Sequence, residues 1–219
     1  MKWKAVLFDL DGTLLDTLAD LGDAMNRVLS RHGFAVHDYE SYKSFIGNGM
    51  ANLVRRTLPG DVAGEAAITA FLKELRAEYD SHWADKTVPY PGVGELLAFL
   101  QKRQLKLAVL SNKNDEFIKK MVERLLPEAV FAVVAGAKPG VPLKPDPAAA
   151  LDIAARLELA PADFIYLGDS GVDMETARAA GMYPAGVLWG FRKADELLES
   201  GAKILLKHPG ELQDFLEKH

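Results

Sequence analysis

Short apolar runs that alternate with helix-like segments constrain the fold of this chain more than any other feature. Between residues 93 and 188, four apolar runs alternate with four segments whose apolar positions repeat with helical spacing. Another apolar run opens the chain, and one more run and a helix-like segment close it. This alternation predicts an α/β fold, a parallel sheet with helices on both faces. The predicted strands are 5–10, 105–110, 130–134, 164–167, 185–188 and 204–206, and the predicted helices around them are 93–102, 116–126, 147–157, 172–180 and 211–218.

A long stretch of purely helical character separates the first predicted strand from the others. Residues 18–32, 45–54 and 66–83 form three helix-like segments, and no convincing strand pattern occurs between them. The simplest organisation is a Rossmann-like α/β core that is interrupted by a helical insertion. The predicted domains are residues 1–15 with 88–219 for the core and residues 16–87 for the insertion.

Composition and charge exclude several classes of function. The 219 residues include no cysteine, so disulfides, thiolate metal sites and cysteine nucleophiles are ruled out. The formal net charge is −5 and no basic stripe occurs, which argues against a nucleic-acid partner. No stretch of about 18 apolar residues offers a membrane span. We expect a cytoplasmic protein without nucleic-acid or membrane partners, whose oligomeric state the sequence does not indicate.

Polar side chains gather where the predicted strands end. In parallel α/β sheets, ligands bind beyond the carboxyl ends of the strands, so these positions matter most for function. Four of the predicted strands are followed by carboxylates, hydroxyls or an ammonium group. These groups are Asp9–Thr13 after the first strand, Ser111–Lys113 after the second, Lys144–Pro147 after the third and Gly168–Asp173 after the fourth.

The residue types in these groups suit a metal ion and a phosphate. Asp9 and Asp169 are hard oxygen ligands of the kind that Mg²⁺ prefers, and a glycine turn lets Asp11 return toward them. Clustered carboxylates repel one another, so we expect a divalent cation among them. Lys144 and hydroxyls such as that of Thr13 suit phosphate oxygens.

Each group also has an ordinary structural explanation. An aspartate at a strand end often closes a turn, and Ser111 with Asn112 would cap the helix that follows. Lys144 would lie in a solvated loop, and Asp173 would favour the start of its helix through the helix dipole. These explanations do not account for four such groups at one edge of a sheet. The combination therefore favours a functional site.

Together, the four groups resemble the four sequence motifs of the haloacid dehalogenase superfamily. The first motif is Asp9–Thr13, the second is Ser111, the third is Lys144-Pro145, and the fourth is Gly168-Asp169 with Asp173. The similarity covers the whole chain, including a helical cap between the first and second motifs. Within the superfamily, Ile46–Gly49 and Leu110–Lys113 are most similar to phosphoglycolate phosphatases.

The resemblance implies a Mg²⁺-dependent phosphatase that acts on a small phosphorylated metabolite. Asp9 would be the nucleophile and become an aspartyl phosphate, while Asp11 would act first as an acid and then as a base. The backbone carbonyl of Asp11 would also bind Mg²⁺. The implied residues are Thr13, Ser111, Asn112 and Lys144 around the phosphoryl group, Asp9, Asp11, Asp169 and Asp173 around the metal, and Gly47, Asn48 and Gly49 of the cap at the substrate.

Other activities of the superfamily remain as alternatives. A dehalogenase does not need the second aspartate of the first motif, so Asp11 argues against dehalogenation. A sugar phosphomutase of the β-phosphoglucomutase type shares both aspartates, and a pyrophosphatase is a further alternative. An inactive regulatory binding module is a remote one, because every catalytic position is intact. In the cap, Arg55 and Arg56 would either contact a substrate carboxylate or remain solvated.

Overall fold

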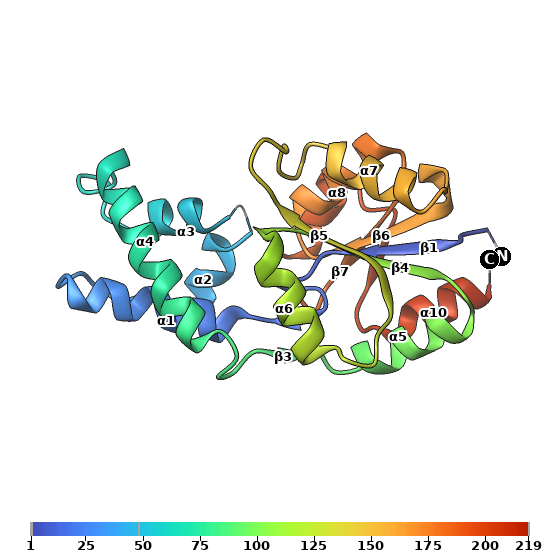
Figure 1. Cartoon of the computed structure of the whole chain (residues 1–219), viewed down its shortest axis with the longest axis horizontal. Coiled ribbons are helices and arrows are strands. Elements are labelled where there is room, and N and C mark those ends of the chain that lie inside the picture. Colours follow the sequence, from blue (N-terminus) through green and yellow to red (C-terminus); the bar gives the residue numbers. More distant parts are fainter. Residues whose placement is uncertain (1, 48, 219) are drawn as a thin grey trace. The chain divides into compact units, whose positions relative to one another are not determined.

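The computed structural model describes residues 2–47 and 49–218, and its chain divides into two compact units. The first unit comprises Met1–Leu15 and Pro89–His219, and the second comprises Asp16–Val88 (Figure 1). The chain crosses between them where two very short strands, β2 (Leu15–Asp16) and β3 (Val88–Pro89), pair with each other. The roles of the two units as catalytic core and cap stay predictions.

The first unit is built on a six-stranded sheet in the order β5-β4-β1-β6-β7-β8. Every pairing in it is parallel, and β1 lies between β4 and β6 with Ala5 opposite Lys106 and Phe164. The predicted α/β fold class is therefore confirmed. The strands are β1 (Ala5–Phe8), β4 (Lys106–Asn114), β5 (Phe131–Ala137), β6 (Phe164–Gly168), β7 (Tyr183–Val187) and β8 (Ile204–Leu206).

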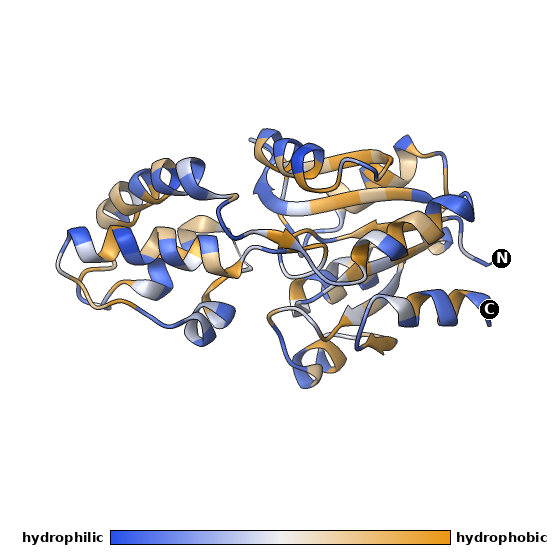
Figure 2. Ribbon diagram, turned by 90° about the horizontal axis from the view of Figure 1, so that it is seen from below, coloured by the Kyte–Doolittle hydropathy of each residue, from blue (hydrophilic) through white to orange (hydrophobic). Residues whose placement is uncertain are grey.

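Helices cover both faces of this sheet, with α7 and α8 on one side and α5 and α10 on the other (Figure 1). Alternate residues of each strand face opposite sides, so Leu7, Leu110 and Tyr166 share one apolar cluster with Ile153 of α7 and Ala177 of α8. Figure 2 shows the strands as the most apolar part of the unit. The helices are α5 (Val93–Lys102), α6 (Asp115–Leu125), α7 (Ala148–Arg156), α8 (Gly171–Ala180), α9 (Ala194–Glu199) and α10 (Gly210–Glu217).

The strand order has a direct consequence for the polar residues at the strand ends. The four groups found in the sequence lie at or beyond the carboxyl ends of β1, β4, β5 and β6, which are four adjacent strands of the sheet. The predicted end of the second strand at residue 110 is wrong, because β4 continues to Asn114 and includes Ser111–Lys113. Because all four strands run in the same direction, their carboxyl ends lie along one edge. Polar groups that are 100 or more residues apart in the sequence, such as Asp9 and Ser111, are thereby brought to the same edge of the sheet.

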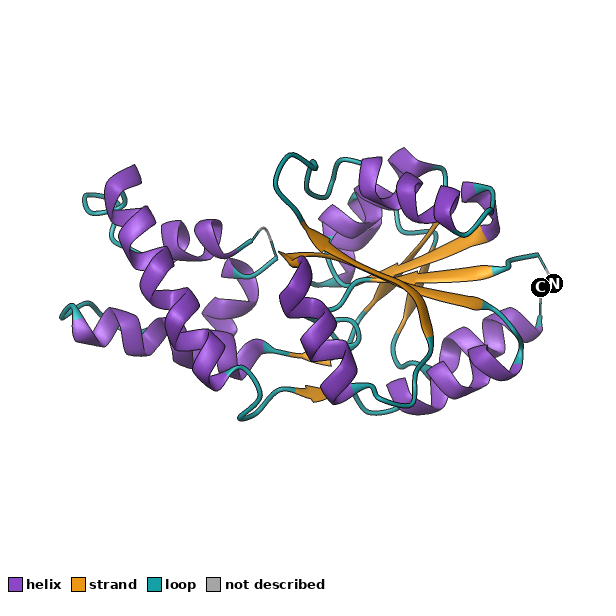
Figure 3. Cartoon of the chain, in the orientation of Figure 1, coloured by secondary structure: helices purple, strands orange, loops and turns teal. Residues whose placement is uncertain are grey.

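The second unit is helical (Figure 3). Its helices are α1 (Leu18–Arg31), α2 (Tyr39–Phe45), α3 (Met50–Thr57) and α4 (Glu65–His82). The single helix predicted over residues 45–54 is wrong, because α2 ends at Phe45 and α3 begins at Met50. Gly47 and Gly49 between them have positive φ angles of 122° and 81°, which a continuous helix does not allow. The sequence did not predict α9, β2 and β3, which are too short to show a repeating spacing of apolar residues.

Within residues 2–47 and 49–218, no helix is both long enough and apolar enough to cross a bilayer.

Candidate active site

Three buried carboxylates meet at the carboxyl edge of the sheet. Asp9 follows β1, Asp169 follows β6, and Asp173 lies in the first turn of α8. Each contributes an oxygen, and these three oxygens lie within 4.8 Å of one another. Carboxylate oxygens at this spacing are suited to holding a hard divalent cation.

The ammonium group of Lys144 lies among these carboxylates. It donates hydrogen bonds to Asp9 Oδ1 at 2.7 Å and to Asp173 Oδ1 at 2.6 Å, and a longer one to the carbonyl of Leu110 at 3.3 Å. Burial works against its charge, but Asp173 and Asp9 outweigh burial and hold the pKa of Lys144 well above its usual value. Lys144 is therefore a permanent positive charge at the sheet edge.

One ammonium group does not neutralise three buried carboxylates. Burial raises the pKa of Asp9 from 3.8 to about 7, against the opposing effect of Lys144 and with a further contribution from Asp173. Burial, Asp9 and Asp173 also hold the pKa of Asp169 well above its usual value. Burial is the largest cause of both shifts, and the neighbouring carboxylates add to it. The donor set therefore fits a divalent cation in both chemistry and charge.

The turn after β1 adds a hydroxyl group to the site. In the part of the chain that the structure describes, Thr13 Oγ1 is fully buried and has no hydrogen-bond partner. A buried hydroxyl without a partner is costly unless a ligand supplies one. Gly12 makes the turn with a φ of 86°, and a side chain there would overlap the carboxylate of Asp169. This position therefore requires glycine for two independent reasons.

Asp11 lies at the same edge but is paired differently. Its Oδ1 accepts a hydrogen bond of 2.7 Å from Lys113 Nζ, and both side chains are largely buried. Lys113 comes from the end of β4, as does Ser111, which is buried and whose hydroxyl oxygen accepts a bond from the Lys113 backbone N–H. The sequence motif included Lys113 without assigning it a role.

The amide of Asn112 holds the segment that carries Lys144. Asn112 Nδ2 donates to the Lys144 carbonyl at 3.1 Å, and Asn112 Oδ1 accepts from the Lys144 backbone N–H at 2.9 Å. The side chain thus positions the lysine, which the sequence did not indicate. Its predicted contact with the phosphoryl group stays a prediction.

Asp173 also fixes the start of α8. Its Oδ2 accepts hydrogen bonds from the backbone N–H and the hydroxyl of Ser170 at 3.1 and 2.6 Å. The other oxygen, Oδ1, faces Lys144 and also accepts a weak bond from the Tyr166 hydroxyl at 3.4 Å. One oxygen of Asp173 thus caps the helix, and the other faces the cluster around Lys144, where its role at a metal stays a prediction.

A fifth strand end contributes a loop that the sequence analysis missed. After β7, Trp189 Nε1 donates to the Thr13 carbonyl at 2.9 Å, and the Phe191 backbone N–H donates to Asp169 Oδ2 at 2.7 Å. Gly190 lies between them, packed against Asp169 and Gly12. The available signal was a tryptophan and a glycine directly after an apolar strand.

The residues predicted to read the substrate belong to the helical unit. Gly47 and Gly49 form the turn between α2 and α3, whereas Asn48 lies outside the described residues. Arg55 donates to Asn52 and Glu65, and Arg56 donates to the carbonyls of Ser44 and Phe45, so both arginines have partners within their own unit. Contacts of these residues with substrate stay predictions.

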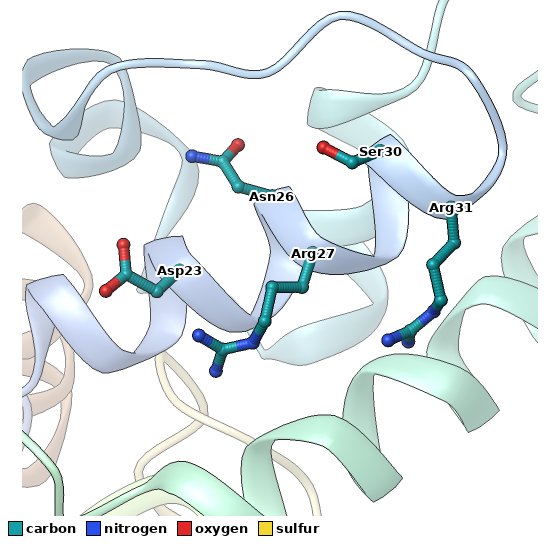
Figure 4. A pocket seen from close by; sticks show the side chains of 5 residues that line it. All are labelled: Asp23, Asn26, Arg27, Ser30 and Arg31. Atoms are coloured by element: carbon teal, nitrogen blue, oxygen red, sulfur yellow. The ribbon is translucent and has the colours of Figure 1, made fainter.

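The helical unit also carries a hollow of about 460 Å³ along α1 (Figure 4). Its charged side chains are already paired. Arg27 and Arg31 both donate to Glu78 of α4 at 2.6 Å, and Asp23 accepts from Lys86 at 2.6 Å. The remaining lining residues are Asn26 and Ser30. The charges are satisfied without a ligand, which gives no reason to assign this hollow a substrate.

Comparison with known proteins places this geometry in a family. The family model for haloacid dehalogenase-like hydrolases matches residues 6–187. A phosphoglycolate phosphatase from Chromobacterium violaceum is 33% identical over 217 residues, which cover 98% of this chain and 96% of that protein.

Solved structures agree with the family model. A protein from Lactobacillus delbrueckii subsp. bulgaricus, assigned as a phosphoglycolate phosphatase, superimposes with a TM-score of 0.92 at 31% identity over 99% of both chains. A protein from Thermotoga maritima, assigned as a β-phosphoglucomutase, superimposes with a TM-score of 0.77 at 27% identity over 98% of this chain and 99% of that one. This chain belongs to the haloacid dehalogenase-like hydrolases and is similar to their phosphoglycolate phosphatases.

Proposed function

We propose that this chain hydrolyses a small phosphomonoester in two steps, with Mg²⁺ as cofactor and phosphoglycolate as the substrate. The observation that carries the proposal is the surroundings of Asp9. Its carboxylate lies at the sheet edge, beside a permanent ammonium group, two further carboxylates and a buried hydroxyl without a partner. A nucleophile, a cation site and phosphate-binding donors are thus within one unit of the protein.

In the first step, a carboxylate oxygen of Asp9 attacks phosphorus. The new bond joins this oxygen to phosphorus, and the bond between phosphorus and the substrate's ester oxygen breaks. The ester oxygen takes a proton from Asp11 and leaves as an alcohol. Lys144, Ser111 and Thr13 donate hydrogen bonds to the phosphoryl oxygens, whose negative charge is spread over the transition state.

In the second step, water attacks the phosphorus of the aspartyl phosphate. Asp11, now a carboxylate, accepts a proton from this water, and the bond between Asp9 and phosphorus breaks. Inorganic phosphate leaves and Asp9 is again a carboxylate. One carboxyl group therefore serves as acid in the first step and as base in the second, which leaves Asp11 ready for the next substrate.

Asp9, Asp169 and Asp173 would hold the metal ion, with the backbone carbonyl of Asp11. When bound, Mg²⁺ supplies positive charge that offsets the repulsion between these carboxylates and the substrate phosphate. Phe191 supports Asp169 through its backbone N–H, and Ser170 supports Asp173. Such supporting bonds orient metal ligands.

Phosphoglycolate is the proposed substrate because the similar phosphatases carry that name. The test is the variant Asp9→Asn, assayed for phosphate release from phosphoglycolate with Mg²⁺ and with a chelator. We expect its kcat to fall at least about 10³-fold, and we expect the wild-type protein to lose activity with the chelator. Asp163→Asn is the control, because Asp163 pairs with Lys4 in an exposed ion pair.

Labelled substrate separates the remaining alternatives. The wild-type protein should form a labelled phosphoenzyme that releases inorganic phosphate, and Asp9→Asn should form none. Label that appears on the Asp9→Asn protein would place the nucleophile elsewhere. Transfer of the label to a second hydroxyl of a sugar phosphate, in place of release to water, would identify a mutase.

A further inference from the structure

Lys113 is a buried cation for which the proposed reaction has no use. Its ammonium group lies 2.7 Å from Asp11 Oδ1, and only 7% of its side chain is exposed. The ammonium group also lies beside α6, at 3.7 Å from Met121 Sδ and 5.7 Å from the centre of the Phe117 ring. Burying and immobilising a lysine costs both hydration and rotamer freedom, so a fixed ammonium at this edge calls for a chemical reason.

The position of Lys113 relative to the leaving group supplies such a reason. Asp11 hydrogen-bonds the ester oxygen when it gives up its proton, and Lys113 contacts the same carboxyl group. If the ester oxygen bonds the same carboxylate oxygen, the ammonium group is within about two hydrogen-bond lengths, or about 5.5 Å, of it. Lys144 is at the phosphoryl side, bonded to Asp9 and Asp173. The two lysines thus lie on the two sides of the bond that breaks.

A carboxylate on the leaving alcohol fits the distance that remains. When one carbon separates the ester oxygen from a carboxylate, standard bond lengths put the carboxylate oxygens up to about 3.6 Å from the ester oxygen. A carboxylate oxygen on the line between the two atoms would be about 1.9 Å from the ammonium group, and one that lies off this line is farther away, so a charge-assisted hydrogen bond of about 2.7–2.9 Å is within reach. While Asp11 holds the proton that the ester oxygen will take, the substrate carboxylate would also serve as the counter-charge of Lys113.

We propose that Lys113 determines specificity by binding the carboxylate of a substrate whose leaving alcohol carries that group next to the ester carbon. This inference rests on the proposed hydrolysis at Asp9, and it adds the residue that reads the leaving group. Specificity for an anionic leaving group then has a determinant in the α/β unit, on the strand that also carries Ser111.

The test compares phosphoglycolate with 2-phosphoglycolamide, which has the same shape and keeps the phosphate but carries an uncharged amide in place of the carboxylate. The measured quantity is the kcat/KM for phosphoglycolate divided by the kcat/KM for the amide. Because both values come from the same protein sample, the ratio does not depend on what fraction of that sample is active. The wild-type ratio should favour phosphoglycolate by about 10- to 100-fold, because a hydrogen bond between charged groups is lost with the amide. Lys113→Met should bring the ratio close to one, and Lys113→Arg should keep most of it.

Lys119→Met is the matched control. It removes one positive charge from α6, but Lys119 is half exposed and pairs with Asp115 and Glu116 on the same helix. Its ratio should equal that of the wild-type protein. If Lys113→Met is too slow to assay, calorimetry in the Asp9→Asn background gives the same comparison from the two dissociation constants.

The outcomes separate this inference from the proposed function. Wild-type protein that hydrolyses neither ester overturns the proposed function together with this inference. Wild-type protein that hydrolyses both, with a ratio that Lys113→Met leaves unchanged, overturns the inference alone. Equal losses on both esters in Lys113→Met would show that the lysine only orients Asp11. A lowered ratio in Lys119→Met would show that general charge, and not position, sets the preference.

Discussion

Gly190→Ala tests whether the loop after β7 supports the proposed metal site. A methyl group at Gly190 would lie 2.6 Å from Asp169 Oδ2, whereas real Cβ atoms keep at least 3.0 Å from other heavy atoms. It would lie closer still to Asp169 Cβ and to the Gly12 carbonyl. One of these neighbours is backbone and another is the stem of a short side chain, so neither rotates away. The loop, or Asp169 together with Gly12, must therefore shift by at least about 0.7 Å.

The size of the effect follows from the contacts that such a shift disturbs. Inserting a methyl group into a packed site costs about 1–3 kcal/mol. The bond of 2.7 Å from the Phe191 N–H to Asp169 Oδ2 is lengthened or lost, and a hydrogen bond to a charged group contributes about 1.5–3 kcal/mol. We expect the free energy of unfolding to fall by about 3–5 kcal/mol. Because the displaced group is a proposed metal ligand, the Mg²⁺ affinity should also fall about 10- to 100-fold.

Urea unfolding gives the first quantity, and a Mg²⁺ titration of phosphate release gives the second. Gly94→Ala is the control, because a methyl group there meets no atom within 4 Å and alanine is favoured over glycine in the helix α5. It should be neutral or stabilising by up to about 1 kcal/mol and should leave the Mg²⁺ titration unchanged. Normal stability and a normal Mg²⁺ titration in Gly190→Ala would refute the idea that this loop holds Asp169 in place.

Two further predictions concern stability. Asp20 is buried and accepts hydrogen bonds from the backbone N–H groups of Lys86 and Thr87 and from the Thr87 hydroxyl. Asp20→Ala should therefore lower the free energy of unfolding in urea by about 3 kcal/mol. A decrease as small as that of Asp61→Ala, at an exposed position, would contradict this. Burial raises the pKa of Asp9 from 3.8 to about 7 in the folded protein. Between about pH 4 and 7 the metal-free folded protein therefore binds more protons than the unfolded chain, and its stability falls as the pH rises through that range. Thermal unfolding in a chelator should therefore give a lower Tm at pH 8 than at pH 6, Mg²⁺ should restore the Tm at pH 8, and a difference that persists undiminished in Asp9→Asn would exclude Asp9 as its source.

The fold and the place of the site followed from local patterns. Apolar runs of three to six residues alternate with helical periods, and this suffices for a parallel sheet because few other folds bury such runs. Once the strands are parallel, their carboxyl ends share an edge whatever the strand order is. That is why Asp9, Lys144 and Asp169 could be expected together, although the order β5-β4-β1-β6-β7-β8 was not predicted.

The pairing of side chains within the site did not follow from the sequence. Asn112 carries groups that suit a phosphate equally well, and only the course of the Lys144 segment shows that its amide is bonded to that backbone. Lys113 pairs with Asp11 over 102 residues of sequence, a contact that depends on the register of β4 beside β1. The loop at Trp189 shows no repeating pattern of apolar residues in the sequence. Its contacts are made by an indole N–H and by a backbone N–H, which such patterns do not reveal.

The charges at the sheet edge would couple the binding of metal, proton and substrate in the proposed site. The four aspartates and the two lysines, when all are ionised, leave a formal charge of −2 before any ligand binds. An anionic phosphate ester approaching this edge is repelled unless protons or a divalent cation balance the excess. Protons would balance it at a cost, since Asp9, the proposed nucleophile, can attack only when it is ionised. A divalent cation would balance it while Asp9 stays ionised, so the carboxylates that add to the effect of burial on the pKa of Asp9 would also favour the proposed metal.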